Sequence, residues 1–368
     1  MKIYSKDNVW TAALKRLRWL FSEFENVIVN ISGGKDSTVI YNLALIVAEE
    51  MGRLPLQVMF IDQEAEWNCV IEHVRRSMHD PRVKPLWLQV PIKLFNATSS
   101  REPWLYCWQP GVEWMRDKEP DSIQENTYGT DRFADLFGAY LRQVYPTSPA
   151  INLAGVRCEE SPNRALGLTT SPTYKHVTWG KIRDSKRQHF DFYPLYDWSY
   201  TDIWKAIHDN HWPYCSLYDV MYQYGVPLQM MRVSNVHHET AVDKLFYLQE
   251  FEADTWERLT RRIAGVNTAG KLGFADFFLH HTPLPPMFAD WAEYRDYLVA
   301  NLIEEPAIQQ KFTAYFHDMD RDYAKGMYRI SGPEVLYKAQ INTVLANDYH
   351  FTKLKSFRAG HRDKNYAK

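Results

Sequence analysis

Residues 27–37 read Val-Ile-Val-Asn-Ile-Ser-Gly-Gly-Lys-Asp-Ser, and this stretch decides the fold of the chain. Its β-branched residues predict a buried strand. The two glycines then predict a turn. Apolar residues at helical spacing over residues 38–51 predict a helix that stops at Gly52. A strand, a glycine loop and a helix in this order are typical of an α/β fold.

The loop at residues 32–37 favours an anion. Gly33 and Gly34 let the backbone approach a ligand closely, and the helix that follows directs its positive N-terminus at the same point. Three side chains add hydrogen-bond donors, namely Ser32, Lys35 and Ser37. Asp36 either orients the loop or holds a Mg²⁺ that arrives with phosphates. The alternative is an ordinary glycine turn capped by serine, and neither GxxxxGK[ST] nor GxGxxG is present.

Length and composition bound the remaining choices. The 368 residues predict one large or two ordinary domains, and 45% hydrophobic residues predict a sizeable core. The formal net charge of -2 gives no general attraction to nucleic acid, although a local basic patch stays open. We find no apolar run that could cross a bilayer and no signal peptide, so we expect a cytoplasmic protein without a membrane anchor.

The four cysteines are far apart in the sequence, at Cys69, Cys107, Cys158 and Cys215. CxxC is absent, so we expect neither an iron–sulfur cluster nor a zinc ribbon held by local spacing. Reduced thiols are the expectation for a cytoplasmic chain.

A second strand is predicted over residues 56–61, and Asp62 follows at its carboxyl end. Ligands of open α/β sheets bind outside the carboxyl ends of the strands, so Asp62 is expected near the loop. The alternative is that Asp62 caps a helix over residues 66–78. Glu64 and Glu66 are further candidates.

A third strand is predicted over residues 83–90, and its Pro85 indicates an edge strand or an irregularity. The alternation of strands and helices ends after this strand. Residues 95–150 are interpreted as an insertion rich in aromatic side chains. These aromatics form either a lid or base platform over the site or a small local core.

Another strand is predicted over residues 151–156, followed by two arginines that bracket a pair of glutamates. Arg157 and Arg164 suit an anion held bidentately just past a strand end. A surface salt-bridge cluster is the alternative. Residues 174–187 are locally basic and are either a loop over phosphates, a face for an acidic partner or a solvated loop.

Ser-Gly-Gly-Lys-Asp-Ser resembles the PP-loop of the adenine nucleotide alpha-hydrolase superfamily, which includes the phosphoadenylylsulfate (PAPS) reductases, the small subunit of ATP sulfurylase and the enzymes of DNA phosphorothioation. The resemblance implies a doubly wound, mostly parallel, Rossmann-like sheet of the HUP type. It also implies nucleotide phosphates on residues 32–37 and an acidic residue, here Asp62, beside the nucleotide. Gly155-x-Arg157, followed by Glu160-Ser161 and Arg164, is similar to the second motif of the PAPS reductases, which implies contact with the nucleotide or sulfate.

The resemblance covers about residues 20–235, so we expect a nucleotide-binding domain at 1–235 and a helical domain at 236–368. Helices are predicted there over residues 239–251, 253–263, 288–302, 304–325 and 333–345, with a frayed tail from Gly360. His237-His238-Glu239 favours a helix start over metal ligands, because HExxH is absent.

The reductases carry a reactive cysteine in a C-terminal Cys-Gly-Leu-His tail, and this chain has no cysteine after Cys215. In this respect it resembles the IbrA branch of PAPS reductase-like proteins. That resemblance implies a ParB-like protein partner. Superfamily members often dimerise, so a homo-oligomer stays open.

Three functions remain. The first is attack at the α-phosphate of ATP with Mg²⁺, as a pyrophosphatase or adenylyltransferase, with Lys35, Asp36, Arg157 and Arg164 as catalytic residues. The second is sulfonucleotide reduction, and the third is a non-catalytic nucleotide-sensing subunit. The residues assigned to ATP or PAPS are Ser32, Gly33, Gly34, Lys35, Asp36, Ser37, Asp62, Gly155, Arg157, Glu160 and Arg164. Asp36 and Asp62 are the predicted Mg²⁺ ligands.

Overall fold

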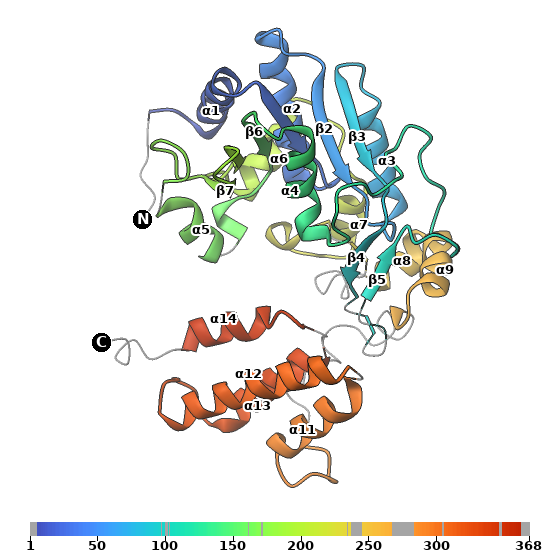
Figure 1. Ribbon diagram of the computed structural model, residues 1–368, viewed down its shortest axis with the longest axis vertical. Coiled ribbons are helices and arrows are strands. Elements are labelled where there is room, and N and C mark those ends of the chain that lie inside the picture. The colour runs from blue at the N-terminus through green and yellow to red at the C-terminus, as the bar shows by residue number, and fades with distance from the viewer. Residues whose placement is uncertain are drawn as a thin grey trace. The chain divides into compact units, whose positions relative to one another are not determined.

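The computed structural model describes residues 6–96, 98–99, 102, 104–160, 162–170, 172–233, 235–236, 245–266, 283–303, 305–345 and 348–361. The chain divides into two compact units (Figure 1). The first comprises Met1–Leu94 and Tyr106–Asn235, and the second comprises Phe95–Leu105 and Val236–Lys368. Residues 95–105, predicted as part of an insertion in the first domain, therefore belong to the second unit instead.

A six-stranded sheet in the order β3-β2-β1-β6-β8-β7 organises the first unit. Its strands are β1 (Asn26–Asn30), β2 (Leu56–Ile61), β3 (Val83–Leu88), β6 (Ala150–Leu153), β7 (Gly180–Asp184) and β8 (His189–Phe192). Only β7 runs antiparallel to its neighbour in this sheet. The chain winds from β1 to one edge and then returns to β6 on the other side of β1. This order confirms the predicted α/β fold with a doubly wound, mostly parallel sheet.

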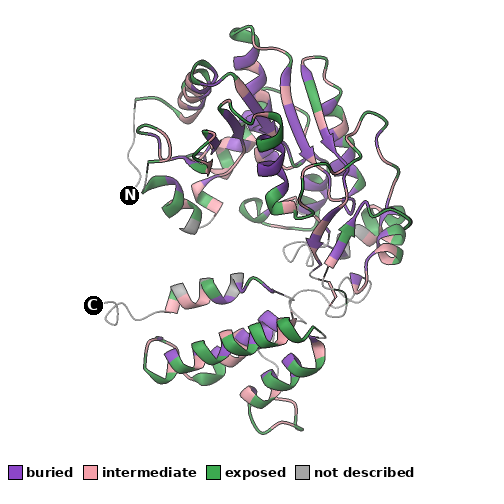
Figure 2. Cartoon of the chain, viewed as in Figure 1, coloured by how far each residue is buried: buried purple, intermediate pink, exposed green. Residues whose placement is uncertain are grey.

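Helices cover this sheet, and two of them, α2 and α3, lie close to the helices predicted over residues 38–51 and 66–78. They are α1 (Val9–Glu23), α2 (Lys35–Glu50), α3 (Asn68–Met78), α4 (Phe133–Val144), α5 (Pro162–Thr169), α6 (Tyr200–Asp209) and α7 (Leu217–Gln223). α2 packs against β1, β2, α1 and α6, so most of its side chains are buried (Figure 2). Side chains fix where helices begin: Asn8 caps α1, and Ser199 with Asp202 forms a capping box at α6.

The aromatic residues after β3 do not form one cluster. β4 (Ile92–Phe95) and β5 (Trp104–Cys107) make a separate two-stranded sheet. Trp104 stacks on Tyr349 within the second unit, with ring centroids 6.4 Å apart. Trp108 is fully buried in the first unit and meets Trp114 edge-on at 5.6 Å. These contacts are those of local cores, the second of the two predicted readings.

The second unit is helical over its described residues. Its helices are α8 (Leu245–Phe251), α9 (Ala253–Arg262), α11 (Trp291–Leu302), α12 (Pro306–Ala324), α13 (Pro333–Leu345) and α14 (Thr352–His361). α14 was not predicted, and its last two residues fall in the tail that was predicted from Gly360. Phe312, Phe316 and Leu336 lie in the core shared by α12 and α13. The helix start predicted at His237-His238-Glu239 lies outside the described residues.

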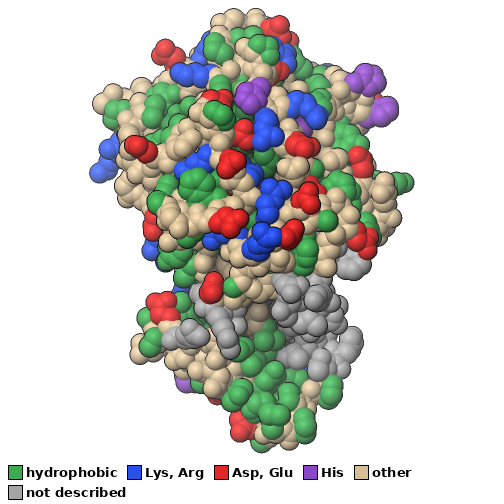
Figure 3. All heavy atoms as spheres, turned by 90° about the vertical axis from the view of Figure 1, so that its right-hand side faces the viewer, with side chains coloured by type: hydrophobic (Ala, Val, Ile, Leu, Met, Phe, Trp, Pro, Cys, Tyr) green, Lys and Arg blue, Asp and Glu red, His purple; other side chains and the backbone are tan. Residues whose placement is uncertain are grey.

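Within the described part of the chain, every helix is too short or too polar to cross a membrane. The face of the first unit seen in Figure 3 carries basic and acidic side chains interspersed. This pattern agrees with the formal net charge of -2.

A buried arginine joins the helices of the second unit. Arg295 of α11 is 3% exposed, and its guanidinium lies 2.7 Å from both Asp320 of α12 and Gln340 of α13. A buried charge is stable only when it is paired, so each partner is needed.

We therefore expect Arg295→Ala to lower the free energy of unfolding of this unit by about 1–3 kcal/mol, because it leaves the buried side-chain oxygen of Gln340 without its donor and takes the cation from Asp320. Arg321→Ala is the control, since the exposed pair of Arg321 with Asp318 contributes little. Urea unfolding, with hydrogen exchange of α11–α13, measures both. Equal effects of the two variants would contradict the structural role of Arg295.

Candidate functional site

The glycine loop connects β1 to α2 and leaves the N-terminus of α2 open to a ligand. Gly34 is the N-cap of α2 and provides no side chain of its own to cap that end. Gly33 has φ +71°, and a Cβ atom there would lie 2.6 Å from Cγ1 of Val70 on α3. The loop therefore requires glycine at this position, for both its backbone angle and its contact with α3.

The loop also closes on itself through Ser37. The Ser37 hydroxyl accepts the Ser32 backbone N–H at 3.2 Å and donates to the Gly34 carbonyl at 2.8 Å. The Ser32 side chain remains exposed. Backbone amides held in a fixed curve at a helix N-terminus suit an anion such as a phosphate.

The second predicted motif lies directly against the loop. β6 pairs in parallel with β1, with Val29 opposite Leu153. The chain leaves β6 through Gly155, where a Cβ atom would lie 2.5 Å from the carbonyl carbon and oxygen of Asp36. This point is the topological switch of the sheet, where chains of this kind bind ligands.

Asp36 lies between two of the predicted cations. Its carboxylate pairs with Nε of Arg157 and, at 3.0 Å, with Nζ of Lys35. Arg157 is also paired with Glu159 at 2.8 Å, and both Arg157 and Lys35 are 3% exposed. Burial lowers the pKa of the Lys35 ammonium, while Asp36 acts in the opposite direction. Asp36 thus orients both cations beside the loop.

Glu160 lies between two further arginines, Arg164 and Arg232. It forms an ion pair with Arg164, and its backbone carbonyl accepts a hydrogen bond from Arg232 at 3.3 Å. Burial lowers the pKa of Arg164, and the like charge of Arg232 lowers it further because the two guanidinium groups lie close together. Arg232 was not among the predicted site residues, because the family likeness fades around residue 231.

Among the described residues, four cations and three carboxylates therefore lie around the loop. The cations are Lys35, Arg157, Arg164 and Arg232, and the carboxylates are Asp36, Glu159 and Glu160. A guanidinium has five N–H donors, so pairing with one carboxylate leaves donors for other oxygens. The excess of positive charge at an open helix N-terminus favours an anionic ligand.

Tyr218 of α7 contacts the loop, and its role was not predicted from the sequence. Its buried hydroxyl accepts the backbone N–H of Lys35 at 2.9 Å. Its ring lies 5.6 Å from Nζ of Lys35, which also donates to the Met231 carbonyl at 3.1 Å. Burial raises the pKa of the Tyr218 phenol, so it remains protonated.

Asp62 lies apart from these contacts, fully buried between β2, β3 and the chain that follows them. Its carboxylate accepts hydrogen bonds from Trp87 at 2.8 Å and Gln89 at 2.9 Å, and it pairs with Arg116 at 2.5 Å. It does not cap α3, whose N-cap is Trp67. The carboxylate of Asp62 therefore fixes the end of β2 to its surroundings.

Two other carboxylates after β2 are buried as well. Glu64, at φ +62°, accepts the backbone N–H groups of Trp108 at 2.6 Å and Met115 at 3.2 Å. Glu66 accepts a hydrogen bond from Asn235. Burial, and next Asp62, raise the pKa of Glu66 well above its ordinary value. These contacts organise the chain between residues 62 and 115.

The predicted Mg²⁺ ligands do not fit that role in this arrangement. Both oxygens of Asp36 face cations, and those of Asp62 face Arg116 and two side-chain N–H donors. Mg²⁺ needs oxygens that are not already paired with cations. Among the described residues, no group of three or more His, Cys, Asp or Glu side chains could hold a metal ion.

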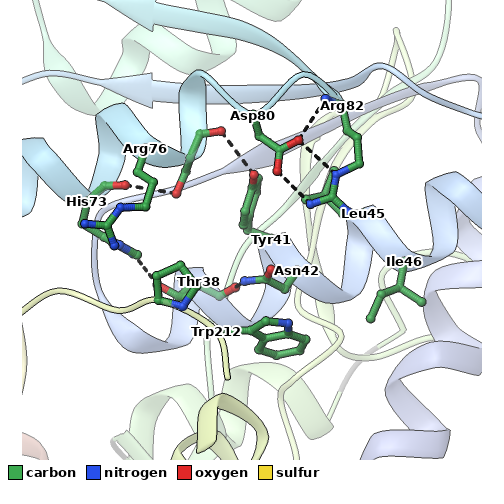
Figure 4. Close-up of a pocket in the computed structure, with 12 residues that line it drawn as sticks. Thr38, Tyr41, Asn42, Leu45, Ile46, His73, Arg76, Asp80, Arg82 and Trp212 are labelled. Atoms are coloured by element: carbon green, nitrogen blue, oxygen red, sulfur yellow. Dashed lines mark hydrogen bonds and ion pairs between the residues drawn. The ribbon is translucent and has the colours of Figure 1, made fainter. Parts of the chain in front are cut away.

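A pocket of about 250 Å³ lies between α2 and α3 (Figure 4). Nε2 of His73 lies 2.8 Å from the Thr38 hydroxyl, which donates to the Gly34 carbonyl at 3.1 Å. A short chain of hydrogen bonds thus links this pocket to the loop. Asp80 and Arg82 pair on the opposite wall at 2.7 Å.

Comparison with known proteins identifies the family of the chain. The model of the phosphoadenosine phosphosulfate reductase domain matches residues 26–224, and a domain of unknown function, DUF3440, matches residues 225–365. The chain belongs to the phosphoadenosine phosphosulfate reductase domain family. The recognition of that family from its two motifs is confirmed.

Two curated relatives illustrate the range of the family. The chain is 30% identical over 329 residues to the uncharacterized protein YbdN of Escherichia coli K12, covering 84% of this chain and 80% of that protein. It is 24% identical over 226 residues to an adenosine 5'-phosphosulfate reductase of Lysinibacillus sphaericus, covering 60% of this chain and 79% of the relative.

Two solved structures resemble part of the chain. A PAPS reductase from Candida auris, in a phosphate complex, is 14% identical with a TM-score of 0.35, covering 60% of this chain and 93% of that one. The FMN adenylyltransferase of Candida glabrata is 17% identical with a TM-score of 0.35, covering 59% of this chain and 62% of that one.

The contact between Gly155 and Asp36 is directly testable. We expect Gly155→Ala to lower the free energy of unfolding by about 1–3 kcal/mol, because the added methyl group meets backbone atoms that cannot rotate away. Gly167→Ala in α5 is the matched control, since no atom lies within 4 Å of its Cβ position. Chemical denaturation measures both variants, and a neutral Gly155→Ala would contradict the contact.

The pocket predicts a dependence of stability on pH. Burial, with Arg76 nearby, lowers the pKa of His73 from 6.5 to about 4. Between these values the unfolded chain binds a proton that the folded chain does not, so stability falls as the pH drops from 6.5 to about 4. The expected loss is about 3 kcal/mol.

Unfolding in urea at several pH values checks this prediction. Compared with the wild type, His73→Asn should flatten the curve between pH 4 and 6.5. His208→Asn, which changes an exposed histidine, should leave the curve as it is. Parallel curves for wild type and His73→Asn would show that His73 titrates normally.

Proposed function

We propose that the chain binds the phosphates of ATP at residues 32–37 and promotes attack at the α-phosphate, as a pyrophosphatase or adenylyltransferase. The observation that carries this proposal is the open N-terminus of α2 at the switch point of the sheet, with four cations around it. Membership of the family supports an adenine nucleotide as the ligand.

The chemistry follows from where charge develops. An acceptor oxygen attacks the α-phosphorus, the bond to the bridging oxygen breaks, and pyrophosphate leaves with that electron pair. Lys35, Arg157 and Arg164 stabilise the charge on the phosphates, and Asp36 positions the first two. Such a transfer depends on positioning and electrostatics, so it needs no side-chain nucleophile. Mg²⁺ bound to the phosphates would neutralise further charge without using Asp36 or Asp62.

Sulfonucleotide reduction is the second candidate, because curated relatives carry the name adenosine 5'-phosphosulfate reductase. That chemistry requires a reactive thiolate. Cys69, Cys107 and Cys215 are buried, so a molecule as large as a sulfonucleotide does not reach their thiols. Burial, and then Asp197, raise the pKa of Cys158, which disfavours its thiolate. These environments favour the α-phosphate reaction or nucleotide sensing over reduction.

The first experiment is isothermal titration with ATP·Mg²⁺, AMP and PAPS, with pyrophosphate release assayed on the same samples. We expect ATP to bind and pyrophosphate to appear. Lys35→Ala with Ser37→Ala should weaken ATP binding at least tenfold, because it removes a cation and the side chain that closes the loop. Lys84→Ala, an exposed lysine on β3, is the matched control.

Each result discriminates between the candidates. Retained ATP affinity in the double variant would overturn the loop as the binding site. Binding of PAPS without turnover would favour a sulfonucleotide sensor over an ATP enzyme. Arg157→Ala and Arg232→Ala should each weaken triphosphate binding several-fold, and an unchanged affinity would remove that arginine from the site.

A ParB-like partner and a homo-oligomer, both implied by the family resemblance, stay predictions. Light scattering of the purified chain would measure its oligomeric state. Copurification with a ParB-like protein encoded nearby would test the partner.

A further inference from the structure

Two cysteines far apart in the sequence touch in the first unit. Sγ of Cys69 lies 3.7 Å from Sγ of Cys215, across 146 positions of the chain. Both side chains are buried, at 7% and 1% exposed. The sequence spacing gave no sign of this pair, because the contact depends on how α3 meets the segment that precedes α7.

Each of these cysteines adjoins a support of the loop. Cys69 is the second residue of α3, next to Val70, whose side chain fills the space beside Gly33. Cys215 precedes α7 by two residues, and Tyr218 of that helix binds the Lys35 backbone. The two sulfurs therefore meet between two segments that each contact the loop, one through Val70 and the other through Tyr218.

We propose that Cys69 and Cys215 are an oxidant-sensitive pair that a peroxide converts to a disulfide, which ties α3 to the segment that precedes α7. One thiolate attacks the peroxide, breaks the O–O bond and becomes a sulfenic acid as water leaves. The second thiol attacks that sulfur and releases a second water. Two thiols lose two electrons in total, and one hydrogen peroxide molecule takes them up.

The geometry favours this bond over other products. A disulfide has an S–S distance of about 2.05 Å, so the sulfurs must approach by about 1.7 Å. Cys69 is the more exposed of the two and is the first to react. The neighbouring thiol then traps its sulfenic acid before further oxidation.

The other cysteines are placed differently and serve as internal controls. Sγ of Cys107 contacts the carbonyl of Gln63 at 3.0 Å, and Cys158 is partly exposed beside Arg157. These surroundings differ from the sulfur–sulfur contact of Cys69 with Cys215, so the pairing is expected to be specific.

The test uses the full chain and needs no nucleotide, so its outcome is independent of the proposed function. The reduced protein is treated with hydrogen peroxide and then denatured in the presence of N-ethylmaleimide, which alkylates the remaining thiols. It is digested without reductant, and the peptides are identified by mass spectrometry. We expect one cross-linked peptide pair containing Cys69 and Cys215, reversible by dithiothreitol, while Cys107 and Cys158 carry the alkylating group.

Variants and melting temperature sharpen the result. Cys69→Ala and Cys215→Ala should each abolish the cross-link, and Cys158→Ala should leave it intact. The bond closes a long loop, so the oxidised wild type should melt about 5 °C higher than the reduced protein. Full alkylation of Cys69 and Cys215 at peroxide doses that oxidise Cys158 would overturn the proposal, as would a cross-link between any other two cysteines. If a variant fails to fold, the peptide map of the oxidised wild type still shows whether Cys69 and Cys215 are cross-linked.

Discussion

The approach of Gly155 to the backbone of Asp36 is the constraint on which the candidate site depends. A parallel pair of strands, β1 and β6, brings two loops to the same edge of the sheet, but only a residue without a side chain lets them touch. Once they touch, Arg157 reaches Asp36, and Asp36 in turn aligns Lys35. The positive end of α2 and the arginines then act on the same volume rather than on separate parts of the surface.

This arrangement explains which parts of the site could be predicted from the sequence. The loop, the helix after it and Gly155 with Arg157 could be predicted because each depends on neighbours within a few residues. Their meeting could also be expected, since parallel strands direct their carboxyl ends to one edge. The fold of the first unit follows from the same local signals, including the capping box at Ser199.

Other features depend on packing between distant segments and leave little trace in the sequence. Tyr218 and Met231 contact Lys35 across 183 and 196 positions of the chain. Asp62 stood at the predicted edge of the sheet, yet its partners Trp87 and Arg116 come from later segments that carry no motif. A carboxylate at a strand end can either bind a ligand or secure a loop, and only its neighbours decide between the two.

The placement of residues 95–105 limits how the chain could be divided by protein engineering. A shortened chain ending at residue 235 would keep Phe95 and Trp104 but lose Tyr349, on which both rings pack. Such a product would present aromatic surface to water and tend to aggregate. To isolate the first unit, one would also delete residues 95–105 and rejoin Leu94 to Tyr106, which belong to paired strands. The boundary between the units is thus crossed by the chain more than once, and a single cut cannot separate them.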